Sequence, residues 1–235
     1  MNDEFKLGVF HQGLTTKNCL EKLRYFCEHD AFPRYDVAGY NYIHQSDRFQ
    51  RDLLTAMNRE MMARSPKKAW APLLDKPLSV LADIPTDVDL IDSPETIYFE
   101  ARKKMRSYYL MITNINWITD MAASKMLYLK RPKLAAISDS YVRTMLNISE
   151  PDTRKHPYRS QFYTARVLSV CDTVRKIGQE NITLLNSLQE KMSPVVISKA
   201  RIVDILIWVE MAISQNHPTW GTATKLNGWD CIIKG

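Results

Sequence analysis

The chain has 235 residues, of which 45% are apolar and 25% are charged, a balance that is typical of a globular protein and excludes extensive disorder. Its formal net charge is +6. No run of 18 apolar residues occurs, so we expect no membrane-spanning helix. The glycine-rich loops of nucleotide-binding domains are absent, as are C-x-x-C and H-E-x-x-H, so we expect no cofactor and no metal.

The N-terminal sequence MNDEFKLGVF has acids where an export signal needs bases, and no apolar stretch follows them. The chain has only four cysteines. Because disulfides are rare in reducing compartments, both features favour a cytoplasmic location.

The first predicted element is a helix over residues 15–29, capped by Thr15 or Thr16, in which apolar residues recur at helical spacing. A tyrosine-rich stretch surrounds Gly39 and predicts an extended segment or a minor β-hairpin near residue 40. Residues 66–94 contain five prolines and should form short helical turns and loops.

Helical patterns fill the rest of the chain. Further helices are expected over residues 47–63, 94–113, 119–130, from 139 onward, 159–178, 180–191 and 194–214. No period-two stretch is long enough to build a central sheet. The sequence therefore predicts an all-α fold over residues 1–235, built as one unit or as two lobes. Asp204 falls on an apolar helix, so we expect it to be a buried partner of an arginine.

Positive charge is concentrated in one third of the chain. Residues 101–176 contain 15 Lys and Arg but five Asp and Glu, which gives this segment +10 and leaves −4 for the remainder. Such asymmetry is typical of a surface that follows phosphates, although a solvated basic face without a partner gives the same count.

The segment 115–143 has the most informative order of residue types. A tight loop at 115–119 leads into a helix whose small residues Ala122, Ala123 and Ser124 allow another helix to approach closely. An apolar patch at 134–137 is followed by a single acid, Asp139, at the head of the next helix.

This segment resembles the helix-hairpin-helix DNA glycosylases, most strongly over about residues 108–146. Aligning Ala123 with the alanine that follows the family's hairpin places Asp139 on the catalytic aspartate without a gap. The whole chain also resembles a divergent bacterial branch of this superfamily, in the stretches YDVAGYNYIHQSDRF, YLKRPKLAAISDSYV and ARIVDILIWVEMA. The resemblance implies a helix-hairpin-helix glycosylase-like bundle, and members that excise modified cytosines in phage defence make that role an option here.

Two departures from the family pattern qualify the chemistry. Trp117, Ile118 and Thr119 occupy the positions of the usual Gly-hydrophobic-Gly hairpin, so a backbone with positive φ is harder to form. Met121 stands where bifunctional members have the lysine that forms a Schiff base with the sugar, and a thioether cannot do so. Lys125, one turn later, either substitutes for that lysine or contacts a phosphate.

The resemblance and the charge pattern together assign candidate roles. Asp139 is the expected catalytic carboxylate, and its alternative role is a helix cap alone. Extrusion of a base from the duplex requires aromatic partners, although each such residue could equally be core filler. The expected DNA contacts are Thr119, Lys125, Lys130, Arg131, Lys133 and Arg143. The expected base-pocket residues are Tyr35, Tyr40, Tyr42, His44 and Trp117.

The sequence thus predicts a monomeric DNA glycosylase that removes a damaged or modified base from double-stranded DNA and leaves an abasic site. The alternatives are a non-catalytic DNA-binding module of the same fold and a domain whose basic face meets an acidic protein. Strongly salt-dependent DNA affinity separates both DNA hypotheses from the last one.

Overall fold

The computed structural model describes residues 5–6, 15–16, 18–29, 79–116, 118–148, 157–218 and 220. Over these residues the chain is all-α, as the sequence predicts, and has eight helices. The helices are α1 (Cys19–His29), α5 (Ser79–Ala82), α6 (Glu95–Thr113), α7 (Asp120–Lys130), α8 (Ser140–Met145), α9 (Arg159–Glu180), α10 (Ile182–Lys191) and α11 (Lys199–Ser214). In the same residues, the only strands are β1 (Phe5–Lys6) and β2 (Thr15–Thr16), which pair antiparallel.

Most predicted helices that fall on described residues begin and end within two residues of their expected bounds, but two begin later. Thr15 and Thr16 pair with β1 instead of capping a helix, and Asn18, at φ 56°, separates that strand from α1. Likewise, α11 begins at Lys199 because Ser198 caps it. The hairpin expected near residue 40 and the helix expected over 47–63 lie outside the described residues.

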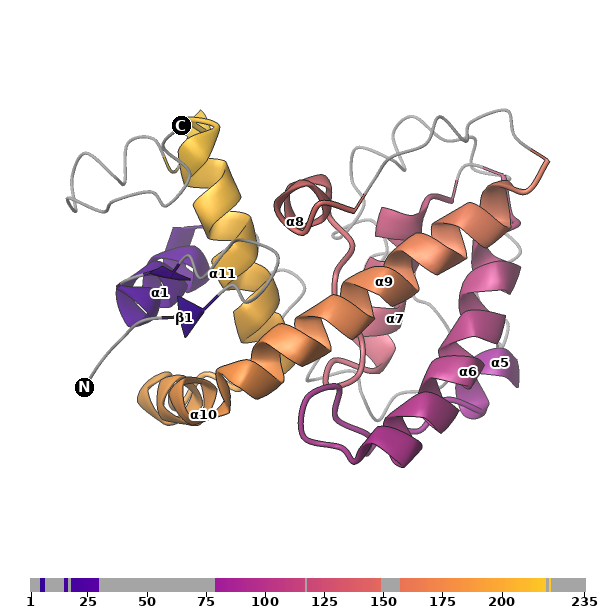
Figure 1. The fold of residues 1–235 in the computed structure, drawn as a ribbon, viewed down its shortest axis with the longest axis horizontal. Coiled ribbons are helices and arrows are strands. Elements are labelled where there is room, and N and C mark those ends of the chain that lie inside the picture. Colours follow the sequence, from indigo (N-terminus) through magenta and orange to yellow (C-terminus); the bar gives the residue numbers. More distant parts are fainter. Residues whose placement is uncertain are drawn as a thin grey trace.

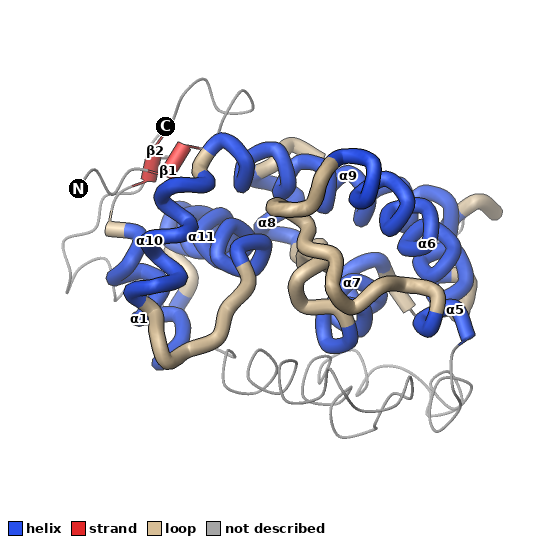
Figure 2. Tube along the Cα trace, turned by 90° about the horizontal axis from the view of Figure 1, so that it is seen from below, coloured by secondary structure: helices blue, strands red, loops and turns tan. Residues whose placement is uncertain are grey.

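The helices form two groups that α9 connects (Figure 1). One group contains α1, α10 and α11, and the other contains α5, α6 and α7. Figure 2, at right angles to this view, shows the same division, with α8 between the groups. Helix α6 packs on α9, and α8 packs on α11. Buried apolar side chains from both groups form one continuous core.

The contact between α6 and α9 combines close packing with polar pairing. Arg102 on α6 forms a bidentate ion pair with Asp172 on α9, at 2.8 and 2.6 Å, and Tyr98 donates a hydrogen bond to the same carboxylate. Next to them, burial raises the pKa of the Cys171 thiol to about 12. A thiol with such a pKa is inert at neutral pH because only the thiolate is nucleophilic.

Helix α11 is buried along most of its length and carries two buried ion pairs. Lys22 of α1 contacts Glu210 at 2.5 Å, and both side chains are almost fully buried. Arg201 contacts Asp204 at 2.7 Å, which confirms the prediction that Asp204 is the buried partner of an arginine. These pairs fix the register of α11, on which α8 rests. Among the described helices, none is both long and apolar enough to cross a membrane.

Candidate active site at the start of helix α8

The loop between α6 and α7 is a tight turn held from outside by an arginine. The amide of Ile115 donates to the carbonyl of Ile112, and that of Ile118 donates to the carbonyl of Ile115. Arg159, at the start of α9, places Nη2 3.4 Å from the carbonyl oxygens of both Thr113 and Ile115. The guanidinium therefore neutralises partial negative charge where carbonyls converge, in a turn that contains no glycine.

Helix α7 begins immediately after this turn and is buried on several faces. Thr119 caps it, because its hydroxyl accepts a hydrogen bond from the amide of Ala122 at 3.4 Å. Ala122, Ala123 and Ser124 are fully buried. Tyr108 of α6 donates its hydroxyl to the carbonyl of Ala123, at 3.4 Å. The small residues thus allow the close approach that the sequence predicts.

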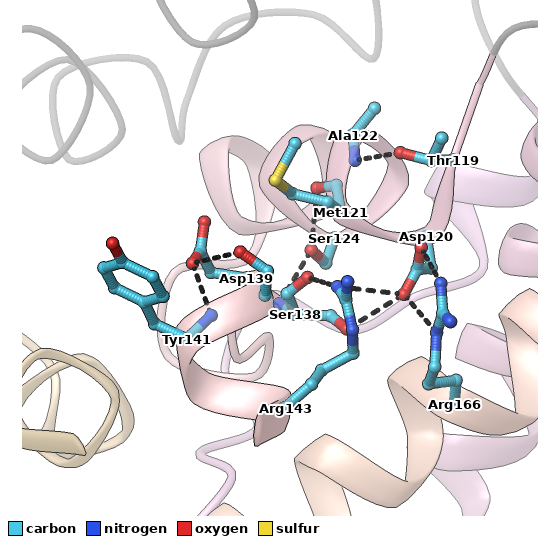
Figure 3. A network of polar contacts seen from close by, with 11 residues as sticks. Thr119, Asp120, Met121, Ala122, Ser124, Ser138, Asp139, Tyr141, Arg143 and Arg166 are labelled. Atoms are coloured by element: carbon cyan, nitrogen blue, oxygen red, sulfur yellow. Dashed lines mark hydrogen bonds and ion pairs between the residues drawn. The ribbon is translucent and has the colours of Figure 1, made fainter. Parts of the chain in front are cut away.

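Asp120, the first residue of α7, is the centre of a buried polar network (Figure 3). Arg166 of α9 forms two hydrogen bonds to its carboxylate, at 2.7 and 2.6 Å. Arg143 of α8 lies 3.3 Å from the same carboxylate. All three side chains are at least nine-tenths buried. Since two guanidiniums face one carboxylate, these three groups have a net charge of +1.

Ser138 connects this network to α8, and each of its polar groups is hydrogen-bonded. Its amide donates to the hydroxyl of Ser124 at 2.9 Å, and its own hydroxyl donates to Asp120 at 3.2 Å. Its carbonyl accepts from Arg143 Nη1 at 2.5 Å. These three hydrogen bonds therefore hold the backbone in one position at Ser138, the residue immediately before Asp139.

Asp139 is half-buried and is the N-cap of α8. Its Oδ1 accepts a hydrogen bond from the amide of Tyr141 at 3.0 Å, and the hydroxyl of Ser140 lies 3.5 Å from the same oxygen. In Figure 3 its carboxylate points toward Tyr141, away from the arginines that neutralise Asp120. Asp139 thus presents a positioned carboxylate at a partly exposed helix start.

One hydroxyl group joins the backbone of Met121 to that of Ser138, the residue before Asp139, although 17 positions separate the two in the chain. The hydroxyl of Ser124 donates to the carbonyl of Met121 at 2.9 Å and accepts from the amide of Ser138, the neighbour of Asp139. Lys125 lies one turn after Met121 on the same face of α7 and is half-buried.

Three of the predicted phosphate contacts are wrong, because their charged groups serve the interior. Lys130, Arg131 and Arg143 are buried. Arg131 donates to the carbonyls of Ile84 and Leu81 at 2.7 and 2.5 Å, and Arg143 bonds to Ser138 and Asp120. A buried guanidinium must be hydrogen-bonded, and here carbonyls at helix and turn ends supply the acceptors.

Of the remaining predicted phosphate contacts, Lys133 is exposed, and Thr119 and Lys125 are half-buried. The residues that were predicted to line a base pocket, Tyr35, Tyr40, Tyr42, His44 and Trp117, lie outside the described residues.

Sequence reasoning missed Asp120 and Arg166 as the centre of the network, because their pairing joins α7 to α9 across 46 positions. It also missed the ring cluster of Tyr141, Trp208 and His217, which joins α8 to the end of α11. Of these residues, only Tyr141 could have been suspected from the sequence, because it follows the candidate catalytic residue Asp139 by two positions.

A family model described as "Family of unknown function (DUF6308)" matches residues 23–211, most of the chain. The chain belongs to this family. The DUF6308 match runs from α1 to α11 and includes Asp120, Asp139 and Trp208, whereas His217 lies beyond it. No curated protein and no solved structure matches the chain significantly.

Proposed function

We propose that this DUF6308 chain is a DNA glycosylase that extrudes a damaged or modified base from a duplex and hydrolyses its N-glycosidic bond. The observation that carries the proposal is the setting of Asp139. A half-buried carboxylate begins α8, and the residue before it is hydrogen-bonded through its amide, hydroxyl and carbonyl. The helix-hairpin-helix resemblance expects a catalytic aspartate at this position.

Asp139 supplies what the reaction needs. As the bond between the sugar C1′ and the base nitrogen breaks, the base leaves with the bonding electron pair and positive charge develops on the sugar. The carboxylate stabilises that charge and accepts a proton from the water that adds to C1′. The products are a released base and an intact strand with an abasic site. Because Ser138 is fixed, the carboxylate needs little reorganisation to act.

The position of Met121 favours a monofunctional enzyme. Its carbonyl shares the Ser124 hydroxyl with the amide next to Asp139, so this residue lies where an amine could reach the same sugar. A thioether forms no imine with an opened sugar, and strand cleavage by β-elimination requires one. Lys125, one turn away, is the alternative amine.

Phosphate contacts in this proposal come from the residues near the site that face solvent, Lys133 together with the partly exposed Lys125 and Thr119. The protein would act as a monomer on double-stranded DNA in the cytoplasm. Its substrates would carry a lesion or a modified cytosine of the kind found in phage DNA.

A second candidate function is a DNA-binding module of the same fold without catalysis. One observation favours it: Oδ1 of Asp139 already accepts the amide of Tyr141, as a purely structural cap would. In that case Asp139 serves only to begin α8.

The experiment is a screen of duplexes, each with one damaged or modified base, followed by alkali, which cleaves the strand at abasic sites. The panel includes uracil, alkylated and oxidised bases, and 5-hydroxymethylcytosine with and without glucose. We expect alkali-dependent cleavage with at least one substrate. If no member yields abasic sites while the duplexes still bind, the DNA-binding module is the correct function.

A further inference from the structure

Three aromatic side chains meet next to Asp139, one from α8 and two from α11 and the turn that follows it. Tyr141 lies in the first turn of α8, Trp208 lies on α11, and His217 follows the end of α11. The ring centroids of Tyr141 and His217 both lie 5.6 Å from that of Trp208, and they are 6.3 Å from each other. All three side chains are partly exposed.

This cluster has a rigid backing. Trp208 also packs against two buried rings, Phe26 at 5.7 Å and Trp220 at 6.1 Å between centroids. Trp220 is fully buried and Phe26 is almost so. The cluster therefore belongs to the core on one side and reaches solvent on the other. Its rings are inclined to one another by 38° to 90°, so a planar ligand can stack on one ring and meet the others at their edges.

His217 is held in place by the way α11 ends. Asn216 has a φ of 51°, its amide donates to the carbonyl of Ile213, and the amide of His217 donates to the carbonyl of Ala212. These are the two hydrogen bonds of a Schellman motif. The Nδ1 atom of His217 is buried, and it makes no hydrogen bond within the part of the chain that the structure describes. Such an atom is normally paired, so it is suited to a ligand.

We propose that the Tyr141–Trp208–His217 cluster receives the extruded nucleobase, which stacks on one of its rings and hydrogen-bonds through one edge to His217 Nδ1. The inference rests on the proposed function, because it supplies the second half of the same site. The amide of Tyr141 donates to the carboxylate of Asp139, so the cluster begins two residues from the group that acts on the sugar. An extruded base must lie within one sugar–base bond of that group.

The first test uses free bases and therefore does not depend on catalysis. The full chain is titrated with cytosine, 5-hydroxymethylcytosine, adenine and uracil at millimolar concentrations, and tryptophan fluorescence is followed. We expect saturable quenching that is lost in Trp208→Phe and kept in Phe99→Leu, a control at an exposed ring on α6. Tyr141→Ala should weaken binding by about tenfold, the loss typical of one stacking partner. Equal quenching in Trp208→Phe and wild type, or no saturable quenching with any base, would overturn the inference.

His217→Phe tests the hydrogen bond separately, because it keeps an aromatic ring but removes Nδ1. The variant should bind all four bases with similar affinity, whereas the wild type should prefer some of them. If the same preference persists in His217→Phe, Nδ1 does not read the base. Circular dichroism of each variant confirms that it is folded.

The outcomes separate this inference from the proposed function. If wild type releases a base from DNA and Tyr141→Ala does so with unchanged kcat/KM, the cluster is not the base site although the glycosylase assignment holds. If bases bind the cluster but no duplex loses a base, the cluster stands as a base-binding site and the glycosylase assignment is wrong.

Discussion

At the scale of single residues, the structure assigns different tasks to two aspartates that are 19 positions apart. Asp120 is buried between two arginines and organises the junction of α7, α8 and α9. Asp139 is half-buried and faces away from them. Ser138 joins the two, so the internal pairing of Asp120 determines where the carboxylate of Asp139 lies.

Asp120→Asn should strongly destabilise the fold. The change removes the negative charge that Arg143 and Arg166 share, and breaking a buried ion pair from one side costs about 3–5 kcal/mol. Urea denaturation measures the free energy of unfolding. The control is Asp172→Asn at the more exposed pair with Arg102, which should cost about 1 kcal/mol or less. If both variants lose the same free energy of unfolding, the buried pairing of Asp120 contributes no more to stability than the more exposed pair of Asp172.

Met121→Lys should create an activity that the wild type lacks. A lysine there would place an amine next to Asp139, and borohydride would trap its imine with the opened sugar as a protein–DNA adduct. We expect efficient trapping by Met121→Lys on a substrate that wild type cleaves, and little by wild type. Strong trapping by wild type that disappears in Lys125→Ala would contradict the monofunctional mechanism and identify Lys125 as the nucleophile.

At the scale of elements, side chains and turn residues with local signatures set the helix ends. Thr119, Asp139 and Ser198 each accept an amide of the first turn that they cap. Asn147 and Asn216 adopt positive φ after α8 and α11, as residues that end helices often do. These ends determine where Asp139 and His217 lie, so the candidate site depends on helix termini more than on helix faces.

Gly178→Ala should destabilise α9, although alanine favours helices over glycine by about 0.5–1 kcal/mol. A Cβ at Gly178 would lie 2.3 Å from Cδ1 and 2.7 Å from Cγ1 of Ile91. Arg175 donates to the carbonyls of Leu90 and Ile91, which limits the movement of that segment. We expect a net loss of about 1–3 kcal/mol in urea denaturation. Ser169→Ala, at an exposed position of α9, is the control and should be neutral. A more stable Gly178→Ala would show that Ile91 relaxes freely.

The sequence predicts the helices well because their apolar spacing and caps are local signals, as for α7 and its cap Thr119. It also places Asp139 at a helix start. The prediction of phosphate contacts is wrong for Arg131 and Arg143, which donate to buried carbonyls. The sequence alone does not distinguish an arginine that binds a phosphate from one that binds a carbonyl in the interior. The pairing of Asp120 with Arg166, and of Tyr141 with Trp208, depends on tertiary packing that no spacing encodes.

At the scale of the whole molecule, the charge asymmetry has two origins. Part of the positive charge in residues 101–176 is internal, because Lys130 and the arginines Arg131, Arg143 and Arg175 are buried. The rest faces solvent. Its exposed members among the described residues are Lys103, Lys104, Arg106, Lys133 and Lys176. A DNA-binding surface therefore has fewer positive charges than the sequence count implies. We accordingly expect the affinity for DNA to depend only moderately on salt concentration.

The affinity for duplex DNA should fall by about 40-fold between about 50 and 200 mM salt if about three phosphates are contacted. Lys133→Ala should reduce the slope of log K against log salt by about one. Lys103→Ala is the control, because Lys103 pairs with Glu100 on α6 and lies outside the proposed surface. Fluorescence anisotropy with a labelled duplex measures both. A salt-independent affinity would favour a protein partner for the basic face.

The most direct measurement compares wild type with Asp139→Asn on the duplex that gives the most abasic sites. Asparagine can still cap α8 but cannot carry the charge that stabilises the sugar cation. We predict that single-turnover base release falls by at least about 100-fold, while duplex affinity stays equal or rises. Release at the wild-type rate by folded Asp139→Asn would contradict the account and leave Asp139 as a helix cap alone.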